Sequence, residues 1–141
     1  MLGSSLRTAA GIAAITCISA CGSDSATAAR SVVGSFTLQT VNGQPLPYTI
    51  SDVPTSGVQI LVVSPSTMIV KSNDTFQFVI TTKSTVPGMG PVVQVDTAVG
   101  TYRLSGRTLL MTAQGTTNQG EWDGVNRLTL NAMPDVLVFV R

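Results

Sequence analysis

Apolar and polar residues alternate along several short stretches of the chain, and turn-forming residues separate these stretches. The alternation is cleanest over residues 127–132, where Leu128, Leu130 and Ala132 fall on one face and polar residues on the other. Such alternation over roughly four to eight residues is typical of a β-strand with one buried face. Related patterns predict further strands at 35–41, 67–72, 75–82, 92–104, 108–113, 119–122 and 136–140.

Two features modify this pattern. Residues 58–63 (VQILVV) are apolar at nearly every position, which predicts a strand covered on both faces or by its neighbours. Ser64-Pro65-Ser66 is expected to end that strand, because proline lacks the backbone donor that a central strand needs. Gly100 stands inside the strand predicted at 92–104 and indicates a bulge or bend.

Short turns join the predicted strands. Asn42-Gly43 and Asp123-Gly124 are strong hairpin signals, because Asn, Asp and Gly tolerate positive φ, and Asn73-Asp74 is placed like a third. Consecutive hairpins without a helical segment predict an antiparallel meander. Closing it removes aggregation-prone edges, so we expect an all-β domain closed into a small barrel of about eight to ten strands. A two-sheet β-sandwich is the alternative, which local pattern does not separate from the barrel.

The first twenty residues have the parts of a secretory signal. Arg7 supplies a basic start, residues 8–18 are uncharged and mostly apolar, and the segment 18–21 (ISAC) ends in Cys21. The apolar stretch is too short to span a bilayer, which takes about 20 apolar residues. The segment ISAC resembles the bacterial lipobox, in which the cysteine is acylated and becomes the first mature residue. An ordinary cleavage site at 26–28 (ATA) is the competing interpretation.

The cysteine count supports lipid attachment at Cys21. Cys17, the only other cysteine, would leave with the signal, and the chain has no histidine to complete a zinc site. We therefore expect a signal peptide at 1–20, a flexible lipid-anchored tether at 21–33 and a barrel domain at 34–141. The expected cofactor is none beyond acyl chains on Cys21. By resemblance to lipoproteins of double-membraned bacteria, Gly22 after the cysteine favours the outer membrane.

Five short segments resemble small bacterial lipocalin-like (calycin-type) lipoproteins. They are 34–38 (GSFTL), 41–47 (VNGQPLP), 100–102 (GTY), 109–112 (LLMT) and 138–141 (VFVR). The resemblance covers about half of the domain and concerns shape, so it implies a barrel more than a ligand.

Charge and composition exclude several classes of function. Eight basic and seven acidic residues are scattered without a cluster, so nucleic acid is a poor partner. The absence of histidine excludes Ser-His-Asp and Cys-His catalysis. Glu121 and Asp123 are the one close carboxylate pair, and could form an acid–base pair or half of a Ca²⁺ site. We expect instead solvated residues beside a turn, with Trp122 packed inward, and therefore no enzyme and no metal site.

The aromatic side chains are the remaining candidates for a site. They would either fill the barrel or line a small apolar ligand pocket, and they are Phe36, Phe76, Phe78, Tyr102, Trp122 and Phe139. The leading hypothesis is a lipid-anchored barrel of the cell envelope that binds a small apolar ligand. The alternative is a structural or protein-interaction module, such as an assembly factor or inhibitor. The expected partners are thus the membrane, through the anchor, and a small ligand or an envelope protein.

Overall fold

The computed structural model describes residues 31–141 of the chain, and the predicted signal and most of the predicted tether lie outside the described residues. The described part holds ten strands and no helix. Their bounds are β1 (Gly34–Val41), β2 (Gln44–Pro45), β3 (Tyr48–Val53), β4 (Val58–Val70), β5 (Thr75–Thr85), β6 (Val92–Ser105), β7 (Thr108–Ala113), β8 (Thr116–Trp122), β9 (Arg127–Ala132) and β10 (Asp135–Val140).

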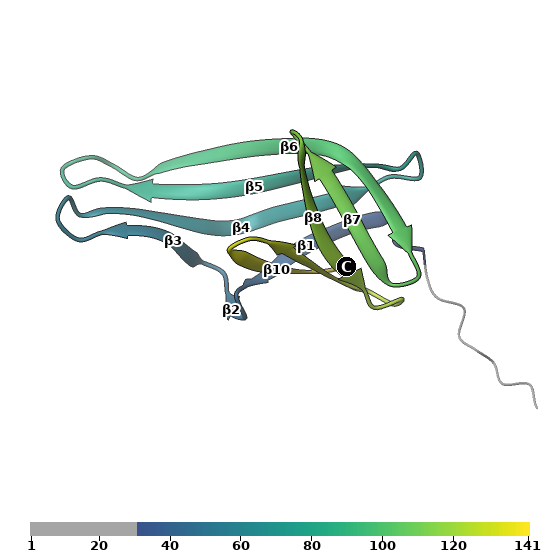
Figure 1. Cartoon of the computed structure of the whole chain (residues 1–141). Coiled ribbons are helices and arrows are strands. Elements are labelled where there is room, and N and C mark those ends of the chain that lie inside the picture. The colour runs from purple at the N-terminus through teal and green to yellow at the C-terminus, as the bar shows by residue number, and fades with distance from the viewer. Residues whose placement is uncertain (1–30) are drawn as a thin grey trace, which may run out of the picture.

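Strand β1 closes the sheet into a barrel (Figure 1). Its first residues pair antiparallel with β4, from Gly34 opposite Val70 to Thr37 opposite Thr67. Its second half pairs with β10, so β1 bridges the two ends of an antiparallel meander. Eight strands form the closed barrel, and β2 and β3 are additional. The predicted all-β barrel is therefore confirmed, and the sandwich alternative is wrong.

The predicted turns join the strands as expected. Asn42 and Gly43 have φ of 52° and 77°, the left-handed pair that a two-residue hairpin turn requires. Asp74 and Gly124 also have positive φ in the β4–β5 and β8–β9 hairpins. The turn at Gln114 and Gly115, with φ of 50° and 78°, was not predicted. It starts β8 at Thr116, three residues earlier than expected.

Ser64-Pro65-Ser66 does not end the strand as expected but forms a bulge inside β4, which runs for 13 residues. The bulge is held by side-chain hydrogen bonds to β5. The backbone N–H of Thr81 donates to Ser66 Oγ at 2.9 Å, and the Thr81 hydroxyl donates to the carbonyl of Pro65 at 2.6 Å. Ser66 is fully buried, so this bond replaces the ladder bond that the bulge interrupts.

Four strands continue beyond the barrel as a protruding sheet, made of β3, residues 58–63 of β4, 79–85 of β5 and 92–99 of β6 (Figure 1). No second layer covers this sheet within residues 31–141. Of residues 58–63 only Val62 is buried and the others are partly buried, so burial of this run on both faces is wrong, whereas partial cover by its neighbours is present.

Gly100 marks the bend at which β6 passes from the protruding sheet into the barrel. A Cβ atom here would collide with the backbone carbonyl of Thr112 and would stand 2.8 Å from the ring of Phe76. Pairing of β6 with β7 begins at the next residue, Thr101 opposite Thr112. The close approach of β7 therefore requires a residue without a side chain, and the predicted bend is present.

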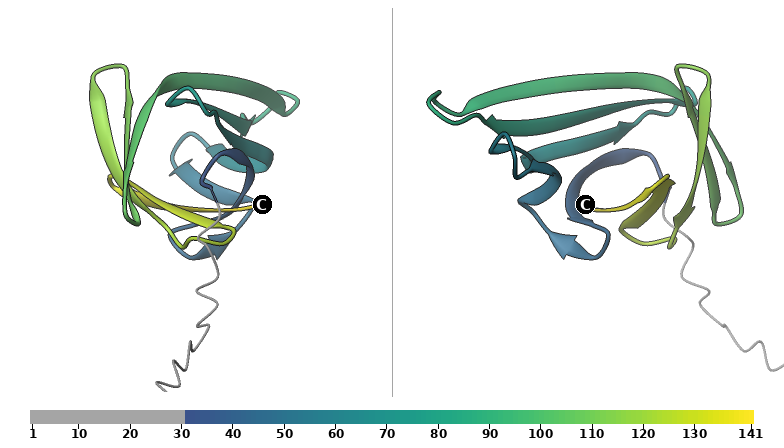
Figure 2. Two further views of the ribbon diagram at one scale, coloured as in Figure 1. Left: turned by 90° about the vertical axis from the view of Figure 1, so that its right-hand side faces the viewer. Right: turned by 60° about the vertical axis from the view of Figure 1, so that its left-hand side comes forward.

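The barrel has two ends, which we call the base and the mouth (Figure 2). The β4–β5, β6–β7 and β8–β9 turns lie at the base, together with Ser31 and Arg141. The β1–β2, β7–β8 and β9–β10 turns lie at the mouth, on the side from which the sheet protrudes. Val32 is 3% exposed and belongs to the core, so packing begins two residues before the expected domain boundary at Gly34.

Candidate functional site at the barrel mouth

The mouth holds an apolar hollow of about 230 Å³. Residues of six strands, β1, β3, β4, β5, β9 and β10, line it, and they are Leu38, Val41, Ile50, Val62, Ile80, Ala132, Asp135 and Leu137. Leu38, Val41, Val62 and Leu137 are buried, whereas Ile50 is 48% exposed at the rim. The hollow is therefore an aliphatic cup that opens to solvent at one side.

One rim of the hollow is fixed by the side chain of Asn42. Its Nδ2 donates to Asp135 Oδ1 at 2.7 Å and to the Tyr48 hydroxyl oxygen at 2.9 Å. Its Oδ1 accepts from the backbone N–H of Val136 at 2.8 Å, and its own N–H donates to the Val136 carbonyl at 2.8 Å. Asn42, which was predicted only as a turn residue, thus also holds Asp135, the one carboxylate that lines the hollow.

The six aromatic candidates lie elsewhere. Phe36, Phe76, Tyr102, Trp122 and Phe139 are buried in the core, and Phe78 packs against it half-buried. Phe36 and Trp122 meet edge to face at 5.6 Å between ring centroids, and so do Phe78 and Phe139. The aromatics fill the barrel interior, and the lining of the hollow does not include them. Their contact with a ligand stays a prediction.

Trp122 lies at the base, where Arg141 covers it. The Arg141 guanidinium carbon is 4.8 Å from the centroid of Trp122 and 5.3 Å from that of Phe36. The Nη1 and Nη2 atoms of Arg141 also donate hydrogen bonds to the carbonyls of Ser31, Val33 and Val125, at 2.8 to 3.2 Å. This contact seals the base, so the mouth is the end at which a ligand could enter. Trp122 fluorescence would report on the base.

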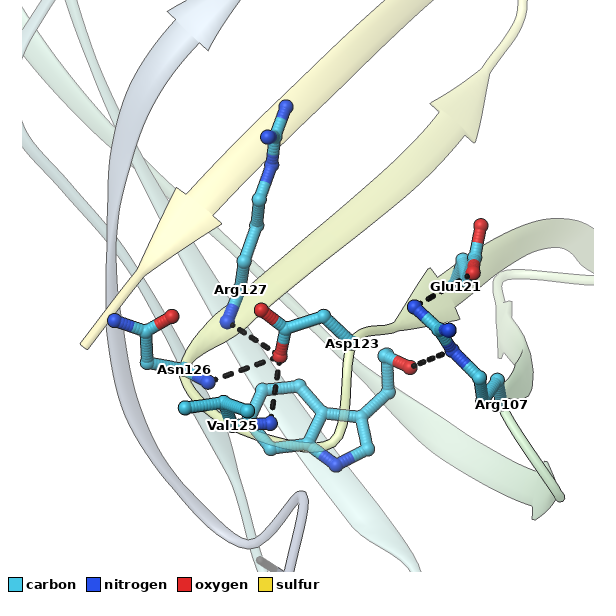
Figure 3. A network of polar contacts seen from close by, with 7 residues as sticks. Arg107, Glu121, Asp123, Val125, Asn126 and Arg127 are labelled. Carbon is cyan, nitrogen blue, oxygen red and sulfur yellow. Dashed lines mark hydrogen bonds and ion pairs between the residues drawn. The ribbon is translucent and has the colours of Figure 1, made fainter. Parts of the chain in front are cut away.

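Glu121 and Asp123 lie near the base, where Glu121 is exposed and Asp123 is half-buried in its turn (Figure 3). Glu121 forms an ion pair with Arg107, 3.1 Å between Oε1 and Nη2, and both side chains are more than 60% exposed. Asp123 points into its own turn and accepts from the backbone N–H groups of Val125, Asn126 and Arg127 at 2.7 to 3.0 Å. The two carboxylates thus interact with different groups, Glu121 with Arg107 and Asp123 with the turn amides, and Trp122 between them is buried.

The turn lowers the pKa of the Asp123 carboxyl below its ordinary value. Partial burial acts in the opposite direction and is the largest single influence. The hydrogen bonds from the backbone of Arg127, Val125 and Asn126 outweigh it together, with help from the positive charge of Arg107. The turn amides therefore favour the ionised form of this carboxylate.

Within residues 31–141 no three Asp, Glu, Cys or His side chains gather closely enough to hold a metal ion. In the same part of the chain, no helix has the length and hydrophobicity to cross a bilayer. Cys21 lies outside the described residues, so lipid attachment there stays a prediction.

Sequence reasoning missed the residues of the hollow. Nothing in the local pattern brings Ile50, Ile80 and Leu137 to one place. They meet only because β3 and β5 extend past the barrel and overhang the mouth. Comparisons of the chain with models of known protein families, with curated proteins and with solved structures found no match.

Proposed function

We propose that this protein is a non-enzymatic, lipid-anchored protein of the bacterial cell envelope whose barrel mouth binds a small apolar ligand. The observation that carries the proposal is the aliphatic hollow at the mouth, formed at the open end of a barrel whose opposite end is sealed by Arg141. Apolar hollows with a few polar groups at the rim are the usual form of small-molecule sites.

The volume of the hollow limits the size of the ligand. An engineered cavity of about 150 Å³ with similar aliphatic lining binds benzene, whereas sites for drug-sized ligands start at about 300 Å³. The hollow of about 230 Å³ lies between these values. It suits a molecule somewhat larger than benzene, or the end of a longer chain.

The single carboxylate on the lining indicates the polarity of the ligand. Asp135 Oδ1 accepts from Asn42, which fixes the carboxylate at the rim. A ligand with an apolar body and one hydroxyl or amino group would place the apolar part against Leu38 and Leu137. Its donor would then face Asp135. A ligand with a carboxylate of its own would be repelled.

The test is a titration with N-phenyl-1-naphthylamine, an uncharged apolar dye whose fluorescence rises in apolar surroundings. We expect saturable binding that the Ala132→Leu variant weakens about tenfold or more, because the added methyl groups fill the hollow. Ala113→Leu is the matched control, since Ala113 is also half-buried against the core but does not line the hollow. Absence of binding, or equal binding by both variants, would refute the site.

The anchor is tested separately. Intact-mass analysis of the membrane fraction should find acyl chains on Cys21, and Cys21→Ser should release the protein or leave its signal uncleaved. A soluble, unmodified product beginning at Ala29 would instead support the ordinary cleavage site. The tether would join the barrel at its base, where Ser31 lies beside Arg141.

An interaction module is the second candidate function. The observation that favours it is the protruding sheet, whose outer strand β6 leaves one side without a neighbouring strand in the described part of the chain. Cross-linking in intact cells tests it: recovery of one dominant protein neighbour would support the module, and recovery of lipid alone would not.

A further inference from the structure

We propose that residues 92–98 of β6 pair antiparallel with the same residues of a second copy of the chain, across a two-fold axis at Val95. The two protruding sheets would join into one continuous sheet. This interaction is independent of ligand binding at the mouth, because none of the residues that line the hollow belongs to β6.

The edge of β6 lacks the features that normally prevent strand pairing. Over residues 92–99 it pairs with β5 alone, and β7 begins to pair only at Thr101. Val93, Val95 and Val99 are 60 to 65% exposed, and Asp96 is the one charged residue of the stretch. Pairing with β5 is regular here, without a bulge. Natural proteins protect such edges with lysines, prolines, bulges or short strands, so a long, regular, apolar edge indicates a partner strand.

The opposite edge of the protruding sheet, strand β3, is protected against pairing with another strand. Strand β3 has only six residues, and its pairing with β4 is interrupted between Thr49 and Ser51. Pro47 precedes it and Pro54 follows it, and the exposed Asp52 adds a charge. This edge is therefore protected, and β6 is the open edge of the two.

The sequence of β6 is complementary to itself in one register. Two copies related by a two-fold axis must pair residues of equal parity, because backbone donors and acceptors alternate between the two sides of a strand. When Val95 faces Val95 of the second copy, each Gln94 faces Asp96 of the other copy. An amide thus meets a carboxylate twice, and Val93 faces Thr97.

The neighbouring registers are less favourable. Moving the axis to Asp96 places the two carboxylates directly opposite each other, which is destabilising. Moving it to Gln94 pairs amide with amide and leaves both Asp96 side chains facing valine. Only the axis at Val95 gives both polar residues a complementary partner.

The polar side chains are already oriented for this pairing. Gln94 Nε2 donates to Asp96 Oδ1 of its own strand at 2.9 Å. The amide has a second hydrogen, which can be donated to the carboxylate of the second copy. Two amides and two carboxylates would then form a ring across the axis. On the other face, Val93 and Val95 of each copy would form one aliphatic patch across the axis, covering side chains that the single chain exposes.

The decisive test changes the charge of Gln94 in both directions. The full-length chain, extracted in a non-ionic detergent, is examined by sedimentation velocity over a range of concentrations. We expect a monomer–dimer equilibrium whose Kd falls about two- to thirty-fold in Gln94→Lys and rises by a similar factor in Gln94→Glu, since the dimer contains two pairs of residue 94 with Asp96. Both variants change an exposed side chain, so the monomer should keep its stability.

Two controls identify the edge and the register. Thr49→Lys and Thr49→Glu place the same charges on the β3 edge, where the Kd should not change. Val95→Cys should form an intermolecular disulfide on mild oxidation, whereas Val99→Cys, opposite Pro91, should not. The proposal is overturned if the chain stays monomeric at every concentration, if both Gln94 variants shift the Kd in the same direction, or if only a different protein occupies the edge.

Discussion

The guanidinium of Arg141 lies over the indole ring of Trp122, 4.8 Å from its centroid, and joins the last residue of the chain to the end of β8. The same side chain donates to the carbonyl of Ser31, the first described residue. A single arginine therefore covers the base by a cation–π contact and by hydrogen bonds to the segment before β1 and to the β8–β9 turn. Its planar fork makes these contacts together, which lysine cannot do.

Replacing Arg141 should therefore weaken the base. We expect Arg141→Ala to lower the free energy of unfolding by about 1–3 kcal/mol, and Arg141→Lys to recover only part of it. Urea unfolding followed by the fluorescence of Trp122, the one tryptophan of the chain, measures both values. The native emission of Arg141→Ala should also shift to longer wavelength as water reaches the ring. Arg103→Ala, at an exposed position on β6, should change stability by less than about 0.5 kcal/mol.

Gly100 gives a second prediction. Gly100→Ala adds a methyl group against the backbone of Thr112, which cannot move without disturbing the β6–β7 pairing. We expect a loss of about 1–3 kcal/mol in the free energy of unfolding. Gly90→Ala is the matched control, because nothing lies within 4 Å of a Cβ at that loop position. Equal effects at both positions would show that the bend of β6 does not need glycine.

The turn at Asp123 should make stability depend on acid pH. The pKa of Asp123 is lowered in the folded chain, so the ionised carboxylate stabilises the fold above the unfolded pKa of about 4. That contribution is lost as the pH falls through the folded value. The stability difference between the native chain and Asp123→Asn should therefore be constant above about pH 5 and shrink below about pH 4. Thermal unfolding at a series of pH values measures it, and a difference that stays constant down to the most acid pH would contradict the prediction.

Tyr102 should produce the corresponding effect in alkali. Burial, followed by the nearby charge of Asp74, raises the pKa of its phenol, and the hydroxyl donates to the Lys71 carbonyl at 2.9 Å. The protonated phenol thus stabilises the fold below the unfolded pKa of about 10, and this is lost as the pH rises through the folded value. Tyr102→Phe should lose about 1 kcal/mol near neutral pH and lack this alkaline loss. Ultraviolet absorbance of tyrosinate and urea unfolding at each pH follow the two effects. A variant that loses stability in alkali as steeply as the native chain would count against the assignment.

The local parts of the fold could be predicted from the sequence. Alternation gave β7 and β9 their bounds, and Asn42-Gly43 and Asp123-Gly124 gave their turns, because these depend on residues that are neighbours in the chain. The inward position of Trp122 between Glu121 and Asp123 followed from the same two-residue period.

The non-local parts could not be predicted in this way. The β1–β4 pairing that closes the barrel joins residues at least 30 positions apart, and no local pattern specifies it. The bulge at Ser66 depends on Thr81 of the next strand, so Pro65, which was expected to end the strand, only interrupts its ladder. The mouth hollow and the open edge of β6 both result from the length by which β3 to β6 exceed the barrel. That excess is a property of the assembled sheet.

The difference between the two edges of the protruding sheet also limits the size of any assembly. Pairing through β6 uses the same strand on both copies, so the unprotected edge of each protruding sheet is occupied once the dimer forms. The edges left on the outside are then the two β3 strands, which are too short and irregular to template another chain. Growth therefore stops at two subunits. A sheet with two unprotected edges could add further copies into a fibre, whereas pairing through β6 alone gives a closed dimer.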